Sequence, residues 1–334
     1  MKEKSFILYN YEIHYDQSWE GYMSAYLFAH FKEKVTPDGE QVYFGVSKDG
    51  FNWEQVNNGN PVLESTLGEK GVRDFTITRK KDNTFVILAT DLSLAYNFKE
   101  KYESNWNKVN REGSKYLSKW ESDDLVNWSE QELIKIVDDN YGCAWAPDII
   151  YDEENQDYMV HWSSRYPADS ANEMAIYYAK TADFKTYTQP KELCHKSDTG
   201  IIDSNIVYEN GYYYRFTKSD FNPAHIILER GTSLTGEYER MPLFDEEMNK
   251  LEDGQYEAPT CYKLPDGSWC LMLDFYGCEK EKQGYVPFVA KDISTGRFVR
   301  SDKAFSFPYG FKHGTVMEIT DEEYKRIKEK YPNN

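Results

Sequence analysis

Apolar and polar residues alternate along most of the chain in short runs, and polar turns separate these runs. One recurring unit is a strand-like run, a turn of Ser, Thr, Asp or Gly, and then a large aromatic residue. It occurs at 42–53, 116–128, 175–187, 225–238 and 285–298. A second unit has two strand-like runs around a polar turn, and it occurs at 73–91, 147–164, 202–219 and 257–274. Both patterns predict antiparallel β-strands joined by tight turns.

The two units together predict a four-stranded meander that repeats roughly every 55 residues, starting near residues 73, 147, 202 and 256. A fifth inner strand is expected at 313–320, close to the end of the chain, and its missing partners at 22–31 and 42–53. The sequence therefore predicts an all-β fold, a five-bladed β-propeller, with the last blade closed by N-terminal strands and a single domain over 1–334. Such closure removes the open sheet edge that would invite aggregation.

Further features refine this prediction. Segment 95–114 is expected to be an insertion within the first meander, and 321–331 a short helix. The aromatic residues that end the first unit are expected to pack between blades: Trp53, Trp128, Tyr187, Tyr238 and Phe298.

Composition agrees with a β protein, because aromatic residues, which favour strands, make up 16% of the chain. The net charge of −18 argues against nucleic acid and anionic membrane surfaces as partners. A mean hydropathy of −0.77 and the lack of any long apolar run exclude a membrane-spanning helix. The N-terminal residues lack the apolar core of a signal peptide, and the five cysteines show no CxxC spacing. We therefore expect a cytoplasmic protein with reduced thiols.

The candidate chemistry lies at the start of each predicted inner strand, where a polar residue recurs: Asp74, Asp148, Asp203, Glu257 and His313. In a propeller these starts converge on one mouth of the central channel. Crowded carboxylates repel, so that one of them retains a proton at neutral pH. Cleavage of a glycosidic bond needs one such acid and one ionised carboxylate. A separation of about 6.5–9.5 Å between them implies inversion of the anomeric centre.

These segments carry a resemblance to glycoside hydrolase family 43, whose members are five-bladed propellers. The similar segments are GVRDFTITR, AWAPDIIY, IIDSNIVYENGYYYRF, YEAPTCYKLPDGSWCLML and KHGTV, between about 71 and 315. The resemblance implies Asp74 as general base, Glu257 as general acid and Asp203 as the residue that tunes the pKa of the acid. It also implies that His313 lies at the channel centre, near a calcium ion or a water cluster, and that no cofactor is required.

The implied activity is that of an inverting α-L-arabinofuranosidase acting on pentose-containing plant oligosaccharides. A β-xylosidase of the same family, a non-catalytic carbohydrate-binding propeller and a phosphorolytic enzyme remain as alternatives. The partner is then an arabinose- or xylose-containing oligosaccharide. Two departures stand out: Phe75 occupies the place of the usual Pro after the base, and the closing strands precede the base.

Other residues are candidates for contact with substrate. Trp145 could stack on the apolar face of a sugar, Asp148 could support the site, and Arg73 could hold Asp74 ionised. Phe75, Trp162, Arg165 and Arg215 are candidate pocket walls. The remaining histidines share no metal-ligand spacing and receive no role: His14, His30, His161, His195 and His225.

Overall fold

The structure is a computed structural model that describes residues 23–32, 34–171, 173–221, 224–251, 254–279, 283–302, 305–308 and 310–334. Residues 1–22, on which the expectation of no signal peptide depends, lie outside the described residues, and His14 is among them. No helix within the described ranges combines the length and apolar character needed to cross a bilayer.

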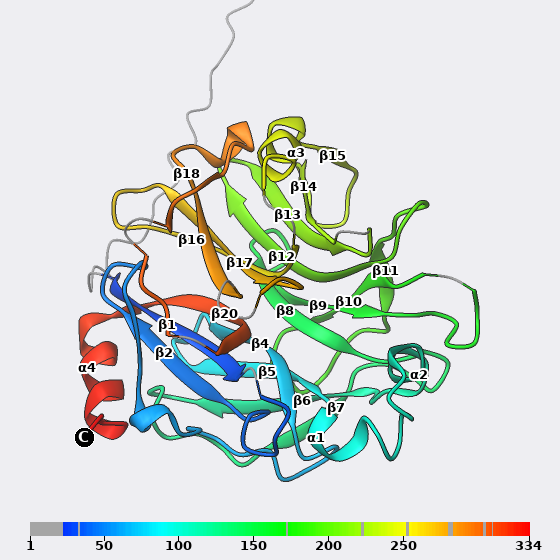
Figure 1. The fold of residues 1–334 in the computed structure, drawn as a ribbon, viewed down its shortest axis with the longest axis horizontal. Coiled ribbons are helices and arrows are strands. Elements are labelled where there is room, and N and C mark those ends of the chain that lie inside the picture. The colour runs from blue at the N-terminus through cyan, green and yellow to red at the C-terminus, as the bar shows by residue number, and fades with distance from the viewer. Residues whose placement is uncertain are drawn as a thin grey trace, which may run out of the picture.

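Five four-stranded antiparallel sheets surround a common centre, as Figure 1 shows, so the predicted five-bladed propeller is confirmed. Blade I contains β4 (Val72–Arg79), β5 (Phe85–Asp91), β6 (Tyr116–Ser122) and β7 (Glu132–Lys135). Blade II contains β8 (Trp145–Asp152), β9 (Asp157–Ser164), β10 (Ala175–Thr181) and β11 (Lys191–Cys194). Blade III contains β12 (Ile201–Glu209), β13 (Tyr212–Ser219), β14 (Ile226–Gly231) and β15 (Tyr238–Arg240). Blade IV contains β16 (Gln255–Lys263), β17 (Trp269–Tyr276), β18 (Gly284–Ala290) and β19 (Val299–Arg300).

Blade V joins the two ends of the chain. Its innermost strand is β20 (Phe311–Thr320), followed outward by β1 (Met23–Lys32), β2 (Tyr43–Ser47) and β3 (Trp53–Gln55). β20 pairs antiparallel with β1, with Val316 opposite Phe28. The predicted closure of the last blade by N-terminal strands is therefore confirmed, and the described chain has a closed ring of blades.

Few helices accompany the blades. α1 (Leu94–Asn97) and α2 (Trp106–Glu112) form the predicted insertion between β5 and β6. α3 (Pro242–Met248) follows β15, and α4 (Asp321–Lys330) is the predicted C-terminal helix, which lies outside blade V in Figure 1. Two single-turn 3₁₀ segments also lie among the described residues: η2 (Asn57–Gly59) and η4 (Ile293–Thr295).

A side-chain belt ties the five inner strands together around the channel. The Thr76 hydroxyl donates to Asp148 at 2.9 Å, and the Asn205 amide donates to the same carboxylate at 2.8 Å. Asn205 Oδ1 in turn accepts from the backbone of Cys261 at 3.0 Å. The last two links are Val316 N to Thr260 Oγ1 at 3.0 Å and Thr315 Oγ1 to Phe75 O at 2.7 Å. Each blade is thus bonded to both neighbours by buried polar groups.

Apolar clusters fill the spaces between neighbouring blades, and four of the five aromatic residues that end the repeats belong to them: Trp53, Trp128, Tyr187 and Phe298. Tyr238 lies in none of these clusters, and the guanidinium of Arg215 stacks over its ring instead. The turns that precede Trp53 in blade V and Trp128 in blade I have nearly the same hydrogen bonds. Asp49 accepts from the backbone of Asn52, and the Trp53 indole donates to Gly50 O at 3.2 Å. Blade I repeats the device: Asp124 accepts from Asn127 N, and the Trp128 indole donates to Leu125 O at 3.1 Å. The carboxylate closes the turn, and the turn fixes the ring against the next blade. Four of the five cysteines are buried: Cys143, Cys194, Cys261 and Cys270.

Candidate active site

A β-bulge interrupts all five inner strands near their starts. The register with the second strand shifts between Arg73 and Thr76, Trp145 and Asp148, Ile202 and Asn205, Glu257 and Thr260, and Phe311 and Gly314. Four of these bulges contain one non-glycine residue in the left-handed conformation: Asp74 at φ 52°, Ala146 at 47°, Asp203 at 53° and Ala258 at 54°. A bulge redirects side chains at the end of a strand. The result is a set of equivalent positions at one mouth of the channel.

His313, from β20, faces the carboxylates of two other blades. Its Nδ1 lies 3.1 Å from Asp74 Oδ1 and 3.9 Å from Asp203 Oδ2. Burial disfavours the charged imidazole, but the negative charges of Asp203 and Asp74 outweigh it and raise the pKa of His313 to about 9. His313 is therefore protonated at neutral pH and places a positive charge between the two carboxylates.

Asp74 is an ionised carboxylate in this setting. Burial opposes its ionisation, but the charge and hydrogen bond of His313, together with the charge of Arg73, hold its pKa below the usual value. Its other oxygen, Oδ2, accepts from Thr90 Oγ1 at 3.1 Å. An ionised carboxylate with both oxygens held in place is suited to take a proton from water.

Glu257 and Asp203 form a second electrostatic unit. Lys218 Nζ, from β13, lies 3.0 Å from Glu257 Oε2. Burial acts to raise the pKa of Glu257, but the charges of Lys218, Lys312 and His313 together lower it. Burial raises the pKa of Asp203 to about 6, and the nearby negative charges of Glu257 and Asp74 act in the same direction. In the substrate-free site a shared proton therefore resides on Asp203 more readily than on Glu257.

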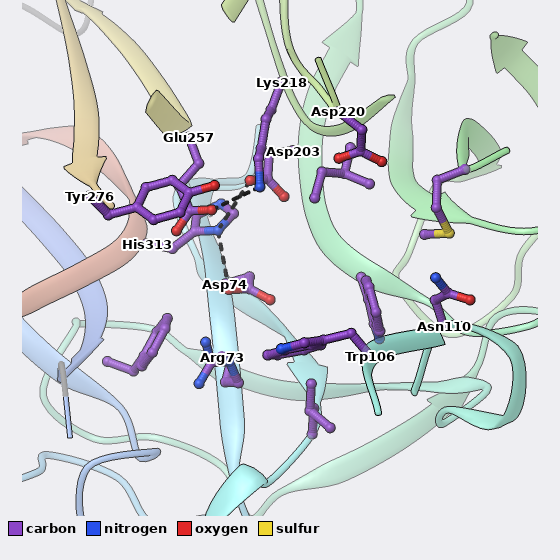
Figure 2. A pocket seen from close by; sticks show the side chains of 15 residues that line it. Arg73, Asp74, Trp106, Asn110, Asp203, Lys218, Asp220, Glu257, Tyr276 and His313 are labelled. Atoms are coloured by element: carbon purple, nitrogen blue, oxygen red, sulfur yellow. Dashed lines mark hydrogen bonds and ion pairs between the residues drawn. The ribbon is translucent and has the colours of Figure 1, made fainter. Parts of the chain in front are cut away.

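A pocket of about 440 Å³ opens over these residues (Figure 2). Asp74, Asp203, Glu257 and His313 all line it, so the structure brings the three predicted catalytic carboxylates and the histidine together. Trp145 also lines the pocket, and its ring lies 6.2 Å from that of Trp106, nearly perpendicular to it. The pocket thus combines charged groups with aromatic surface, a mixture suited to a sugar.

Asp148 does not belong to this set, which corrects the expectation that all five polar residues share one height. It is the second residue after Ala146, the position equivalent to Asp74, so it lies one step deeper in the strand. Its carboxylate accepts from Thr76, Asn205 and the backbone of Ile149, and burial raises its pKa to about 6. Asp148 is thus a link between blades and does not line the pocket.

The two aromatic residues predicted as pocket walls, Phe75 and Trp162, are core residues instead. Phe75 is buried in the cluster between blades V and I, because the residue after the left-handed Asp74 points into the core. Trp162 is fully buried in the cluster between blades I and II. Neither ring lines the pocket.

The two predicted arginines are likewise placed elsewhere. Arg215 is buried, donates to Glu229 at 3.0 Å and stacks over the ring of Tyr238 at 4.0 Å. Arg165 is buried with its guanidinium 3.9 Å from Glu173. Buried guanidinium groups need such partners, and neither one lines the pocket.

Sequence reasoning missed several residues that line the pocket: Phe31, Leu92, Trp106, Asn110, Met174, Ile202, Lys218, Asp220 and Tyr276. Some of these could have been found from strand pairing. Lys218 lies opposite Ile202, and Tyr276 lies opposite Gln255, so both occupy the ends of second strands beside the carboxylates. Trp106 and Asn110 lie in the insertion. Because this segment interrupts the repeat, it could have been identified from the sequence as a source of pocket residues.

The expected calcium near His313 does not fit the donor set. Calcium prefers several oxygen ligands, whereas the Nδ1 of His313 faces Asp74 as an ion pair. Among the described residues no group of three or more His, Cys, Asp or Glu side chains could hold a metal ion. The positive charge at this point comes from the imidazolium itself.

Three carboxylates and a histidine meet at one mouth of a five-bladed propeller, an arrangement suited to the hydrolysis of a glycosidic bond. The sequence profile of the glycoside hydrolase family 43-related group, described as a probable glycosyl hydrolase domain, matches residues 21–325. The chain therefore belongs to this family, and the resemblance seen in the sequence is confirmed.

Individual relatives agree with this assignment. An α-L-arabinofuranosidase of Bifidobacterium longum subsp. longum is 30% identical over 235 residues, which cover 61% of this chain. The match covers 21% of that relative, so the chain corresponds to about a fifth of its length. The fold is similar to that of the family 43 protein BlXynB from Bacillus licheniformis, with a TM-score of 0.58, 13% identity, and coverage of 89% of this chain and 56% of that one. It is also similar to an α-L-arabinanase of Cellvibrio cellulosa solved with arabinohexaose, with a TM-score of 0.57, 14% identity, and coverage of 84% and 93%.

Proposed function

We propose that this domain is an inverting glycosidase that hydrolyses α-L-arabinofuranosides in pentose-containing oligosaccharides. The observation that carries the proposal is the pocket in which a protonated histidine separates an ionised Asp74 from the Asp203–Glu257 pair. Arabinose is favoured over xylose because the 30% identical relative is an arabinofuranosidase. A β-xyloside is the second candidate substrate.

In the proposed mechanism Asp74 takes a proton from the attacking water while Glu257 donates a proton to the departing oxygen. Asp74 is ready for this role because His313 and Arg73 keep it ionised. Glu257 is not protonated in the resting site, since Lys218 stabilises its charge. We infer that the active form has one proton on the Asp203–Glu257 pair, and that the proton moves to Glu257 once the sugar separates Glu257 from Lys218.

The charges in the pocket argue against phosphorolysis. Three cationic side chains lie among the described pocket residues, and each faces a carboxylate. Arg73 pairs with Glu40 at 3.1 Å, Lys218 with Glu257, and His313 with Asp74. A phosphate ion would have to displace one of these pairs.

The test uses nitrophenyl α-L-arabinofuranoside, nitrophenyl β-D-xyloside and arabinobiose, with anomer detection by proton NMR. Asp74→Asn should lower kcat by about 10²–10⁴-fold on every substrate that the parent hydrolyses. Glu257→Gln should lower it similarly on arabinobiose but much less on nitrophenyl glycosides, because nitrophenolate leaves without a proton. Glu209→Gln, which removes a carboxylate paired with Lys263 outside the pocket, serves as control.

Several results would contradict the proposal. Sugar binding without hydrolysis of any pentoside would favour the non-catalytic binding propeller. A rate that requires phosphate would favour phosphorolysis. An equal loss on both substrate types in Glu257→Gln would remove the acid role from Glu257.

A further inference from the structure

The insertion between β5 and β6 forms one wall of the pocket. In the other four blades the second and third strands are joined by shorter connections, and the described residues of these connections form no helix. Here α1 and α2 occupy this position, and Trp106 and Asn110 on α2 face the pocket (Figure 2). The wall is therefore a feature of blade I and not of the propeller repeat.

The buried carboxylate of Glu40, in the connection between β1 and β2 of blade V, holds the start of this insertion. Glu40 accepts from the backbone of Leu94 at 3.0 Å and of Ala95 at 3.1 Å, and from the Ser93 hydroxyl at 2.8 Å. The same carboxylate accepts from Arg73, the neighbour of the proposed base. The insertion is thus bonded to the strand that carries Asp74.

The rest of the insertion is fixed at two further points. Glu69 accepts from Lys101 at 2.9 Å and from the hydroxyl of Tyr102. At the far end, Arg111 donates to the carbonyl oxygens of Ala168 and Ser170, each at 2.8 Å, and so reaches the loop that follows β9 in blade II. The wall is therefore built in place before a ligand arrives.

Trp106 remains half exposed on this fixed wall, at 49% of its surface. Its ring packs against Phe98 at 5.1 Å and against Trp145 at 6.2 Å, which fixes its orientation. Its open surface faces a pocket that also contains Asp74 and Asp203. A rigid indole beside hydrogen-bonding groups matches a sugar ring, which has an apolar C–H face and a polar rim.

We propose that Trp106 is the stacking platform of the pocket, and that the α1–α2 insertion determines which sugar chains it accepts. The inference rests on the proposed function only in taking the ligand to be a pentose oligosaccharide. Since Trp106 supplies apolar contact and no proton, its removal should weaken binding and raise KM far more than it lowers kcat.

The experiment compares Trp106→Ala, Trp106→Phe and Tyr96→Ala. Tyr96 lies on α1 of the same insertion and is also 49% exposed, but it does not line this pocket. Binding of arabinotriose is measured by calorimetry in an Asp74→Asn background, where hydrolysis should be slowed by about 10²–10⁴-fold, and KM and kcat are measured in the parent background. Thermal melting checks that each variant folds.

Trp106→Ala should raise Kd and KM about tenfold, the factor that corresponds to about 1.4 kcal/mol of lost contact. Trp106→Phe should recover most of this affinity, and Tyr96→Ala should bind like its parent. An unchanged Kd in folded Trp106→Ala overturns the platform, even if the parent hydrolyses arabinosides. Weakened binding in a parent that hydrolyses nothing supports the platform and sinks the proposed function. Absence of arabinotriose binding in the parent overturns both.

Discussion

Lys218 controls the proton on the proposed acid, so replacing it with Met gives a sharp test of the site's electrostatics. Its Nζ lies 3.0 Å from Glu257 Oε2, and both side chains are largely shielded from solvent. Met keeps most of the side-chain volume and removes the charge. The pKa of Glu257 should then rise, since burial is opposed only by Lys312 and His313.

The size of the effect follows from the bond that is lost. A hydrogen bond to a charged group contributes about 1.5–3 kcal/mol, and about 1.4 kcal/mol corresponds to one pKa unit. The apparent pKa of the Asp203–Glu257 pair should therefore rise by about 1 to 2, because Lys218 also lowers the pKa of Asp203. A general acid is active below its pKa, and its activity is lost as pH rises through that value.

The assay is the pH dependence of kcat/KM on arabinobiose. The alkaline limb should move to higher pH in Lys218→Met, while the acid limb, which reports Asp74, stays in place. Lys263→Met is the matched control, since Lys263 pairs with Glu209 at 2.8 Å outside the pocket. An alkaline limb that stays fixed or moves to lower pH would refute the assignment of the proton to this pair.

Three further substitutions test the framework of the site. His313 has a pKa of about 9 when folded and about 6.5 when unfolded. Its stabilisation of about 3 kcal/mol should be complete below pH 6.5 and lost as pH rises to 9, so urea unfolding of His313→Gln should lack this decline. Asp148→Ala should lower the free energy of unfolding by about 3 kcal/mol, because it leaves buried donors unpaired. KM should be unchanged in the folded enzyme. A raised KM at unchanged stability would instead show that Asp148 contacts the substrate. Glu40→Gln should lower the melting temperature and raise KM, since it weakens the attachment of the insertion to Arg73; unchanged melting would argue that this attachment is dispensable.

The fold was predictable because the turn residues that define each repeat are close together in the sequence. An Asp recurs in this turn in four of the five blades and accepts from a backbone N–H two or three residues further on, as Asp49 does from Asn52. A large aromatic residue ends the turn in every blade. Blade closure was predictable from the strand left without partners at the end of the chain. These inferences need only short-range patterns and a count of strands.

The pocket walls were less predictable because they depend on contacts between distant segments. Phe75 follows Asp74 directly in sequence but packs in the core, and Trp162 in β9 is also a core residue. Lys218 and Trp106 lie far in sequence from Glu257 and Asp74, and only the assembled ring brings them together. Charge and aromaticity identify candidates, whereas the bulges and the insertion decide which of them face the channel.

The bulges also show why a strained backbone does not by itself mark a catalytic residue in this fold. A left-handed residue with a side chain costs about 1–2 kcal/mol. Ala146 and Ala258 adopt this conformation as fully as Asp74 and Asp203 do, without a carboxylate. The strain therefore belongs to the architecture, because each bulge turns the strand so that the residue two positions after the left-handed one can join the interblade belt. The chemistry depends on which side chains occupy the bulges. In blades I and III the left-handed residue is an Asp, whereas in blade IV the residue before the left-handed Ala258 is Glu257. The bulges therefore present carboxylates at different heights in the pocket.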